Sequence, residues 1–440
     1  MKIKNNNNNN RFISTNGIAS ASIIIARIFY GVNWFNVAAI FSLIALNFNQ
    51  DIALLGSISA AFFIGVGIFQ IPAGVFAAKY SPRTSAISGI ALSSVAALLQ
   101  GFSSEALQLV WLRFIVGAGM ALFFSSGVIL IARYANTKSP GFSIGLMNSA
   151  HSVGGIIGIF VWIIIAQMVG WRLSLILSGA IGIITAILMI IAIPSKQKIG
   201  LIKGSFASVP NKLRVQAESN NDLRNLNILR ILSNGSLIAL GIVLTGAQAA
   251  WGLVLTFIVV YLQNLNLSHE GTGAVASMAL ISSIISAPLI GSYHDRIKAT
   301  KKILLICGIG ISIPLAAIST GILSIIVVSV IAVGFFSGGA FTVAYAKARK
   351  MNIIISKDQN IESNLPNTER GFRGNNFDKT WDYGTLNVAW INGLSLLGVL
   401  WMPIVFSFTV KSWGGYPTAW LISGMLTALF TIIPLGKVSK

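Results

Sequence analysis

The sequence has few charged residues for its length, and this shortage excludes the commonest class of protein. Only 10% of its 440 residues are charged, whereas 55% are hydrophobic and the mean hydropathy is +0.79. A soluble protein of this size needs a charged and polar exterior, which this composition cannot supply. Cysteine is also scarce. Because Cys307 is the single cysteine, no disulfide can form within the chain, and redox chemistry is not expected.

The sequence patterns of enzymes are missing as well. The three histidines and one cysteine lack the spacing of metal ligands, and there is no phosphate-binding loop or Ser-His-Asp set. The glycine-rich runs VGGIIG and FSGGAF lie inside apolar stretches, where glycine serves close helix packing. We therefore predict that the protein is not an enzyme and that it needs no cofactor and no metal.

The sequence does contain long apolar runs, of roughly the 20 residues that a bilayer core of about 30 Å requires. Backbone amides in lipid must bond within their own segment, so each run is predicted to be a helix rather than a barrel strand. The first run is too long for a cleavable signal peptide. The runs cover residues 17–47, 52–78, 84–102, 106–133, 142–168, 172–193, 234–262, 271–292, 302–319, 322–346, 384–410 and 414–436.

The net charge of +20 follows the predicted topology. All but four of the lysines and arginines lie at the termini or after even-numbered runs, while Asp51, Glu105 and Glu270 lie in the opposite loops. This positive-inside pattern predicts a multi-pass protein of the cell membrane (plasma or inner) with both termini in the cytoplasm. No nucleic-acid partner is predicted, because there is no soluble basic domain. The four exceptions are Arg27, Arg113, Arg172 and Lys411.

The polar, basic stretch 195–232 predicts a cytoplasmic linker between two six-helix halves, residues 17–194 and 233–436. Matches between the halves occur in the same order along each, which indicates a duplicated unit of the kind found in transporters. The matched pairs are Trp34 and Trp251, Gly56 and Gly273, Gly74 and Gly291, Lys79 and Arg296, FFSSG (123–127) and FFSGG (335–339), and GLMNSA (145–150) and GTLNVA (384–389).

Two further segments are predicted to lie outside the helices. The Asn-rich stretch 1–16 has nothing to bury and is expected to be a disordered cytoplasmic tail. The stretch 347–383 is expected to be a long cytoplasmic loop within the second half, either an unstructured insertion or a segment that binds a partner.

Four stretches resemble the major facilitator superfamily. GSYHDRIKATKK (291–302) is similar to the loop signature of that family, and GVFAAKYSPR (74–83) is its counterpart in the first half. RFIVGAGMA (113–121) is similar to the helix 4 pattern, and GWRLSLILSG (170–179) to the entry into helix 6. The resemblance extends over residues 12–436. It implies an all-α membrane fold of twelve transmembrane helices in two pseudo-symmetric six-helix bundles.

The resemblance also implies a cytoplasmic gate. In the second half, Asp295 would pair with an arginine and with a neighbouring helix end, and so hold one conformation shut. Ala78 stands where the family usually has this aspartate in the first half, so the latch there would be incomplete. Alternatively, the bases only anchor the topology. The gating residues implied are Gly74, Lys79, Arg83, Gly291, Asp295 and Arg296.

Intramembrane polar residues are costly and therefore mark candidate binding sites. Arg27 and Arg113 lie well inside the apolar runs, and no Asp or Glu does. Two buried guanidinium groups favour an anionic partner. As alternatives, Arg113 could serve coupling or conformational exchange, as its family position implies, and Arg27 could extend toward the membrane surface.

Uncharged polar and indole side chains near mid-membrane complete the predicted substrate site. Any one of them could instead form an interhelical hydrogen bond. His151 is the one histidine inside a run, and a proton taken up there beside an anionic substrate would serve symport. The set is Asn33, Trp34, Asn36, Asn148, His151, Gln248, Trp251, Asn387, Trp390 and Asn392.

Three functions remain open on this basis. The first is a secondary transporter that works by alternating access, coupled to protons, and moves a small anionic metabolite. The second is an efflux pump for drugs or amphipathic compounds, and the third is a membrane sensor or scaffold that does not transport. We predict a monomer whose partners are a small-molecule substrate, protons and membrane lipid.

Overall fold

The computed structural model describes residues 4–48, 52–135, 138–195, 228–351 and 383–438, and these ranges contain helices and no strands. The N-terminal half consists of α1 (Lys4–Ala39), α2 (Phe41–Phe48), α3 (Ile52–Lys79), α4 (Pro82–Gln100), α5 (Ala106–Tyr134), α6 (Pro140–Ile156), the π-helical η1 (Ile157–Val161), α7 (Trp162–Val169) and α8 (Trp171–Ala192). The C-terminal half consists of α12 (Gly235–Asn264), α13 (His269–Ile297), α14 (Thr300–Ala317), η2 (Ile318–Thr320), α15 (Leu323–Lys350), α18 (Tyr383–Ser412), α19 (Gly415–Ile432) and η4 (Ile433–Lys437).

These elements form twelve membrane-length helices, if α6, η1 and α7 are taken as one. Eleven of them are long and apolar enough to cross a membrane. The twelfth is α4, which is richer in serine and packs between α5 and α8. Its serine hydroxyls donate to backbone carbonyls. Ser93 and Ser94 bond to Ile90 within the helix, at 2.9 and 2.5 Å, and Ser85 bonds to Leu122 of α5 at 2.8 Å. The predicted twelve-helix fold is confirmed.

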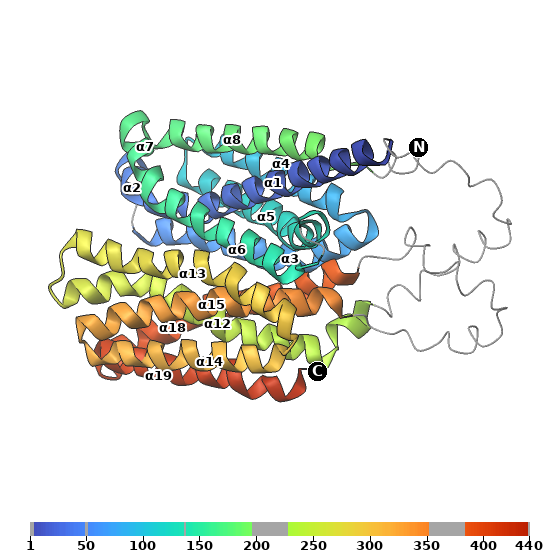
Figure 1. Ribbon diagram of the computed structural model, residues 1–440. Helices are drawn as coiled ribbons and strands as arrows, with labels where there is room; N and C mark the ends of the chain where they lie inside the picture. The colour runs from blue at the N-terminus through green and yellow to red at the C-terminus, as the bar shows by residue number, and fades with distance from the viewer. Residues whose placement is uncertain (1–3, 49–51, 136–137, 196–227, 352–382, 439–440) are drawn as a thin grey trace.

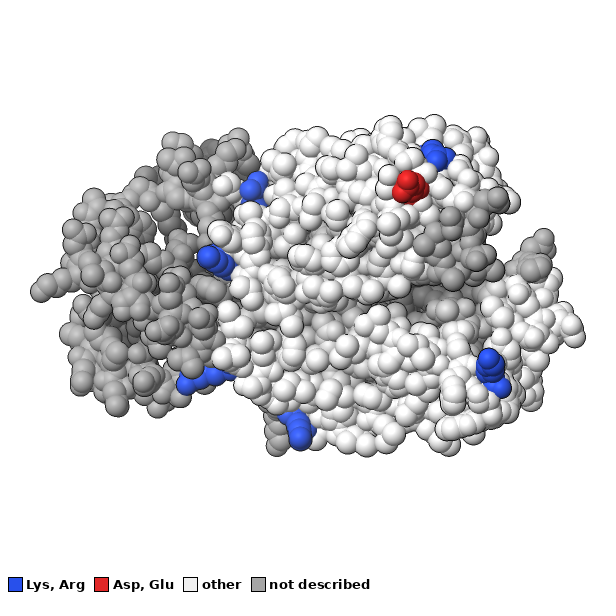
Figure 2. Space-filling model, turned by 180° about the vertical axis from the view of Figure 1, so that it is seen from behind, with Lys and Arg blue, Asp and Glu red and all other residues white. Residues whose placement is uncertain are grey.

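The helices form two bundles that lie side by side, with the N-terminal half above the C-terminal half in Figure 1. Both ends of the chain lie at the same end of the molecule, which we call the termini end, and the other end is the distal end. Figure 2 shows the charged residues of one face gathered toward these two ends, with an uncharged band between them. That distribution suits a protein whose middle is surrounded by lipid.

Two details differ from the sequence-based expectations. The first apolar run forms two helices, because α1 ends at Ala39 and α2 starts at Phe41. Helix α1 begins at Lys4, so it includes most of the Asn-rich stretch that was predicted to be a disordered tail. The stretch is helical because it extends α1, and the rest of α1 packs in the bundle. The predicted linker and loop fall largely on residues 196–227 and 352–382, which lie outside the described residues.

The halves meet closely toward the termini end, along the pairs α6–α13 and α3–α18. Glycines permit this approach, because a helix backbone can come close only where side chains are small. A Cβ atom on Gly145 would lie 2.5 Å from the Cα atom of Pro288, and one on Gly74 would lie 2.6 Å from the Cβ atom of Ala389. Neither glycine could carry a side chain without separating the two halves.

Candidate functional site

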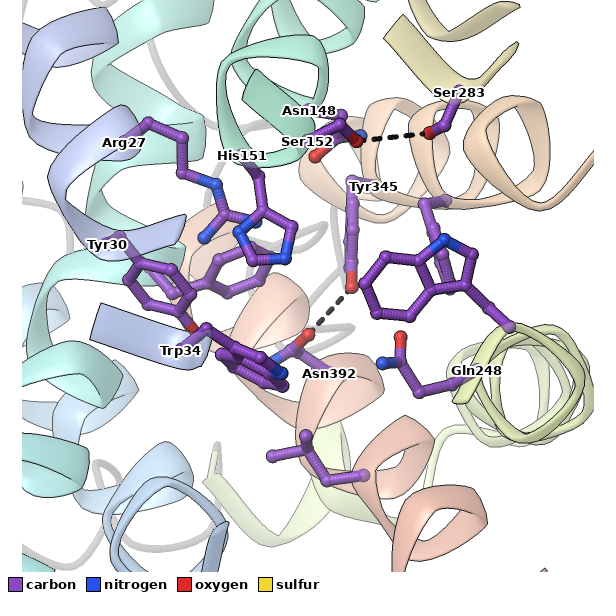
Figure 3. A pocket seen from close by; sticks show the side chains of 14 residues that line it. Arg27, Tyr30, Trp34, Asn148, His151, Ser152, Gln248, Ser283, Tyr345 and Asn392 are labelled. Carbon is purple, nitrogen blue, oxygen red and sulfur yellow. Dashed lines mark hydrogen bonds between the residues drawn. The ribbon is translucent and has the colours of Figure 1, made fainter. Parts of the chain in front are cut away.

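A small cavity of about 50 Å³ lies between the two halves, near the middle of the helices. Helices of both halves contribute to it, and ten of its side chains are labelled in Figure 3. No Asp or Glu belongs to this lining. The lining residues are Arg27, Tyr30, Trp34, Phe124, Asn148, His151, Ser152, Gln248, Trp251, Ser283, Phe341, Tyr345, Asn392 and Leu396.

Arg27 supplies the fixed positive charge of this cavity. Its side chain is 5% exposed, and its guanidinium carbon lies 4.2 Å from the ring centre of Tyr30 and 4.7 Å from that of Phe124. Within the described structure, neither Nε nor Nη1 of Arg27 has a hydrogen-bond partner. The ring faces stabilise the cation, but they cannot replace the hydrogen bonds that it lost on leaving water. The cavity therefore contains a buried cation with unused donors.

The spacing of α1 explains why its cavity side chains cluster. Arg27, Tyr30 and Trp34 are separated by three and four residues, which places them on one face of an α-helix. The rings of Tyr30 and Trp34 stack with their centres 5.5 Å apart. Gly31 of α1 lies against the backbone of Gly154 of α6, and Gly154 lies against the Ile28 carbonyl of α1. The backbones of the two helices are therefore in direct contact.

This contact brings His151 of α6 into the aromatic cluster, beside Arg27 (Figure 3). The imidazole centre lies 5.5 Å from the ring centres of both Tyr30 and Trp34, and 6.0 Å from that of Trp251. Its Nδ1 atom is buried without a hydrogen-bond partner among the described residues. The π-helical segment η1 begins six residues later, and such segments interrupt helices frequently at functional sites.

The C-terminal half contributes neutral groups to the same cavity. Gln248 and Trp251 come from α12, and the Tyr345 hydroxyl of α15 donates to Oδ1 of Asn392 on α18 at 2.7 Å. Gln248 and Asn392 can each donate and accept hydrogen bonds, while the indole of Trp251 forms an apolar wall.

A second cavity of about 180 Å³ continues from the first toward the distal end. Trp34, Gln248 and Trp251 line both cavities, and Val399 and Pro403 extend the second one along the distal part of α18. In Figure 2 the surface is hollowed between the two halves at this end. The halves are therefore in close contact at the termini end and leave a cavity between them toward the distal end.

Seven of the predicted site residues line the central cavity, and five lie elsewhere. Those that line it are Arg27, Trp34, Asn148, His151, Gln248, Trp251 and Asn392. Those that lie outside it are Asn33, Asn36, Arg113, Asn387 and Trp390.

Asn33 and Asn36 face α8 instead of the cavity. The Ser178 hydroxyl donates to Oδ1 of Asn33 at 3.3 Å, and Nδ2 of Asn36 donates to Ser178 at 3.4 Å. Arg113 of α5 donates from Nη2 to the Asn33 carbonyl, and its guanidinium lies over the Phe62 ring, 4.6 Å from the centre. These residues tie α1 to its own bundle.

Asn387 has a similar structural role in the C-terminal half. Its Nδ2 atom donates to the carbonyls of Ala348 and Met351, at 3.1 and 2.8 Å, and so joins α18 to the end of α15. Trp390 is partly buried against the core of this half, and its indole Nε1 has no hydrogen-bond partner among the described residues.

Several lining residues were not predicted. Tyr30 could have been found, because it lies on the same face of α1 as Arg27 and Trp34. Phe124, Phe341 and Tyr345 carry no such signal, since aromatic residues within apolar runs are common and their direction depends on the packing of the helices. Ser152, Ser283 and Leu396 were likewise missed.

The predicted gate residues lie at the termini end. Oδ2 of Asp295, near the end of α13, accepts a hydrogen bond from the Phe142 amide in the first turn of α6 at 3.1 Å. Gly141 and Gly291 are in backbone contact beside it. This is the helix-end contact that the resemblance implied. The implied pairing with Arg296 is not formed within the described structure, and the Arg296 side chain is exposed.

Two of the corresponding residues of the first half, Arg83 and Lys79, act within their own bundle. Arg83 donates from Nε to the Ile193 carbonyl at 2.8 Å and from Nη2 to the Ile190 carbonyl at 2.9 Å, which satisfies the end of α8. The Lys79 ammonium lies 5.4 Å from the ring centre of Tyr80. Gly74 faces Ala389, as described above.

The comparison of this sequence with known families agrees with this architecture. Residues 23–351 match the Major Facilitator Superfamily. The chain belongs to that superfamily.

Relatives with known or assigned solutes share limited identity with this superfamily member. A 4-hydroxybenzoate transporter of Pseudomonas aeruginosa is 20% identical over 273 residues, 58% of this chain and 60% of that protein. A probable sulfoacetate transporter of Cupriavidus necator is 29% identical over 148 residues, 34% of each chain. A D-galactonate transporter of Escherichia coli is 22% identical over 429 residues, 92% of each.

Solved structures share the fold at still lower identity. The proton:xylose symporter XylE is 17% identical with a TM-score of 0.70, over 97% of this chain and 96% of that one. FucP in the outward conformation is 16% identical with a TM-score of 0.62, over 97% of this chain and all of that one. These values support the shared fold and carry no information about the solute.

Proposed function

We propose that this protein is a proton-coupled secondary transporter that moves a small organic anion across the cell membrane by alternating access. The observation that carries the proposal is Arg27, a buried cation with two unused nitrogen donors and no acidic residue in the surrounding cavity. A carboxylate, sulfonate or phosphate would supply both the missing charge and the missing acceptors.

The walls of the cavity favour an anion with an apolar part. Aromatic rings of both halves line the cavity, so a solute bound there would contact ring faces along much of its length. Gln248 and the amide of Asn392 would remain for one or two further polar groups. Three of the matched relatives are named as transporters of 4-hydroxybenzoate, sulfoacetate and D-galactonate, all of which carry an acidic group.

His151 is the proposed proton carrier. A second positive charge beside Arg27 is unfavourable, because the two cations would repel each other in a medium of low dielectric constant. An anion bound between them removes this repulsion, so solute binding and proton uptake by His151 favour each other. The cytoplasmic location of the termini end follows from the distribution of basic residues and is part of the proposal.

The experiment is uptake into proteoliposomes under an imposed pH gradient. The panel contains 4-hydroxybenzoate, D-galactonate and sulfoacetate, with a cationic and a neutral solute of similar size. We expect uptake of at least one anion, faster toward the less acidic compartment, and none of the cation. Uptake of cations or neutral amphipathic compounds without any anion would favour the efflux function, to which the Trp-lined distal cavity is suited.

A further inference from the structure

The two contacts that close the termini end differ in how their polar groups are satisfied. Along α6, polar groups bond across to the other half: Ser149 donates to the Ile284 carbonyl at 2.6 Å, and Nδ2 of Asn148 donates to Thr342 at 3.0 Å. The hydroxyls of Ser152 and Ser283 are 3.4 Å apart. Asp295 adds the bond to the α6 amide described above. This contact is closed by hydrogen bonds between the halves.

The α3–α18 contact contains a buried amide that bonds to nothing described. Gln70 of α3 is 0% exposed, and neither its Nε2 nor its Oε1 atom has a hydrogen-bond partner in the described structure. It faces Gly393 of α18, where a Cβ atom would lie 3.6 Å from Cγ of Gln70. Trp390, whose indole nitrogen also has no partner there, precedes Gly393 by three residues and so lies on a neighbouring part of the same helix face.

Gln70 lies between the central cavity and the termini end. On the termini side of Gly393, Leu386 and Ala389 of α18 pack against Gly74. On its distal side, Leu396 lines the central cavity, three residues or about 4.5 Å further along the helix. Gln70 itself is not part of the cavity lining, and it occupies the wall that a solute must pass to reach the termini end.

The repeat provides a comparison for this position. The offset that pairs Gly74 with Gly291 pairs Gln70 with Ala287, which is 0% exposed and packs against Gly145 in the other contact. In the contact that is closed by hydrogen bonds, an apolar residue therefore occupies the place equivalent to Gln70. A buried amide without partners lowers the stability of the closed state relative to a state in which water or a solute reaches it.

We propose that Gln70 and Trp390 form a hydrogen-bonding subsite for the anionic solute on its path between the central cavity and the termini end. Helices α3 and α18 separate to expose it, and they move apart farther than α6 and α13, which hydrogen bonds hold together. The amide NH₂ and the indole N–H can donate to a carboxylate, sulfonate or phosphate oxygen. Both donors are neutral, so this subsite holds the anion more weakly than Arg27 does and lets it leave. The inference rests on the proposed anion transport.

The first test is thiol labelling, for which the single buried Cys307 is convenient. In a Cys307→Ser background, Gln70→Cys is compared with the matched Ala287→Cys. Each variant is treated from the termini end with an anionic and a cationic methanethiosulfonate. The labelling rate of each reagent is divided by its rate with a small free thiol. We expect Gln70→Cys to be labelled about tenfold faster by the anionic reagent, because the Arg27 guanidinium of the central cavity attracts it. We expect little labelling of Ala287→Cys.

The outcomes separate this path from the proposed function. Equal labelling at both positions, or none at Gln70→Cys in protein that transports, would overturn the path alone. Preference of Gln70→Cys for the cationic reagent would count against anion transport itself.

The second test compares Gln70→Leu with Gln100→Leu. Gln100 of α4 is 1% exposed and its Nε2 atom also lacks a partner in the described structure, but it does not line either cavity. We expect Gln70→Leu to lower the maximal uptake rate of the best anion of the panel about tenfold, with its dissociation constant and the melting temperature preserved. Gln100→Leu should change none of the three. Equal uptake rates in the two variants would overturn the role of Gln70.

Discussion

The two halves of this transporter share an architecture but contribute different chemistry to the cavity between them. The N-terminal half provides the cation, Arg27, and the titratable His151, whereas the C-terminal half provides Gln248, Tyr345 and Asn392, which are neutral. For the proposed anionic solute, the N-terminal half would hold the anion by charge. The C-terminal half would close over it by hydrogen bonds, which are weak enough to break in each transport cycle.

A difference of the same kind exists at the termini end. Asp295 of the C-terminal half accepts a bond from the first turn of α6, while the equivalent residue of the N-terminal half is Ala78, which is 7% exposed. The duplicated unit has therefore kept its backbone geometry and lost the symmetry of its charges. Each difference can be tested by changing one half and using the other as the reference.

The largest effect is expected from Arg27, with the second buried arginine, Arg113, as its reference. Arg27→Gln should weaken anion binding about 10- to 100-fold, because a hydrogen bond to a charged group contributes about 1.5–3 kcal/mol. Arg113→Gln should leave the dissociation constant unchanged, since that guanidinium bonds to the Asn33 carbonyl outside the cavity. The dissociation constant is measured by titrating each purified variant with the anion of the panel that the unaltered protein takes up fastest. Similar losses of affinity in both variants would contradict the assignment of the charge to Arg27.

Moving the charge sharpens the same comparison. The double variant Arg27→Gln/Gln248→Arg places a guanidinium on the opposite wall of the same cavity. We expect it to regain part of the anion affinity and little of the uptake rate, because the charge then no longer lies beside His151. If affinity does not return at all, Arg27 acts through its position on α1 and not through its charge.

His151 is expected to control coupling more than binding. A pH gradient of one unit provides about 1.4 kcal/mol, or about tenfold accumulation, when one proton accompanies each monoanion. His151→Gln cannot carry that proton, so this accumulation should be lost while counterflow exchange of the anion continues. Uptake at several imposed gradients measures the effect. A variant that still accumulates the anion in proportion to the gradient would exclude His151 as the carrier.

The sequence predicted the helices well, because the length of an apolar run is set by the thickness of the bilayer. It predicted the rotation of each helix poorly. On α1, Arg27 and Trp34 face the cavity while Asn33 and Asn36 face Ser178. A soluble helix shows its buried face by hydrophobicity, but in a membrane both lipid and bundle interior are apolar, so this signal is missing.

The hydrogen-bond partner of Asp295 could also be predicted only in part from the sequence. The family resemblance implied a helix end and an arginine, and the residue bonds to the backbone of Phe142, more than 150 positions away. A backbone amide leaves no mark in the side-chain sequence. The distinction between Asn148, which bonds across the halves, and its repeat equivalent Asn387, which bonds within one, likewise depends on helix packing alone.

The smallest effect is expected at the latch. A carboxylate at a helix N-terminus contributes about 0.3–1 kcal/mol, so Asp295→Asn should shift the population toward the state open at the termini end by about two- to fivefold. Ala78→Asp would place a carboxylate at the equivalent position facing α18 and should shift it by a similar factor in the opposite direction. Spin labels on the termini ends of α3 and α18 report both shifts as distance distributions. If the two substitutions shift the population in the same direction, the latch is not what distinguishes the halves. The unbonded Gln70 then better explains why the α3–α18 contact opens rather than the α6–α13 contact.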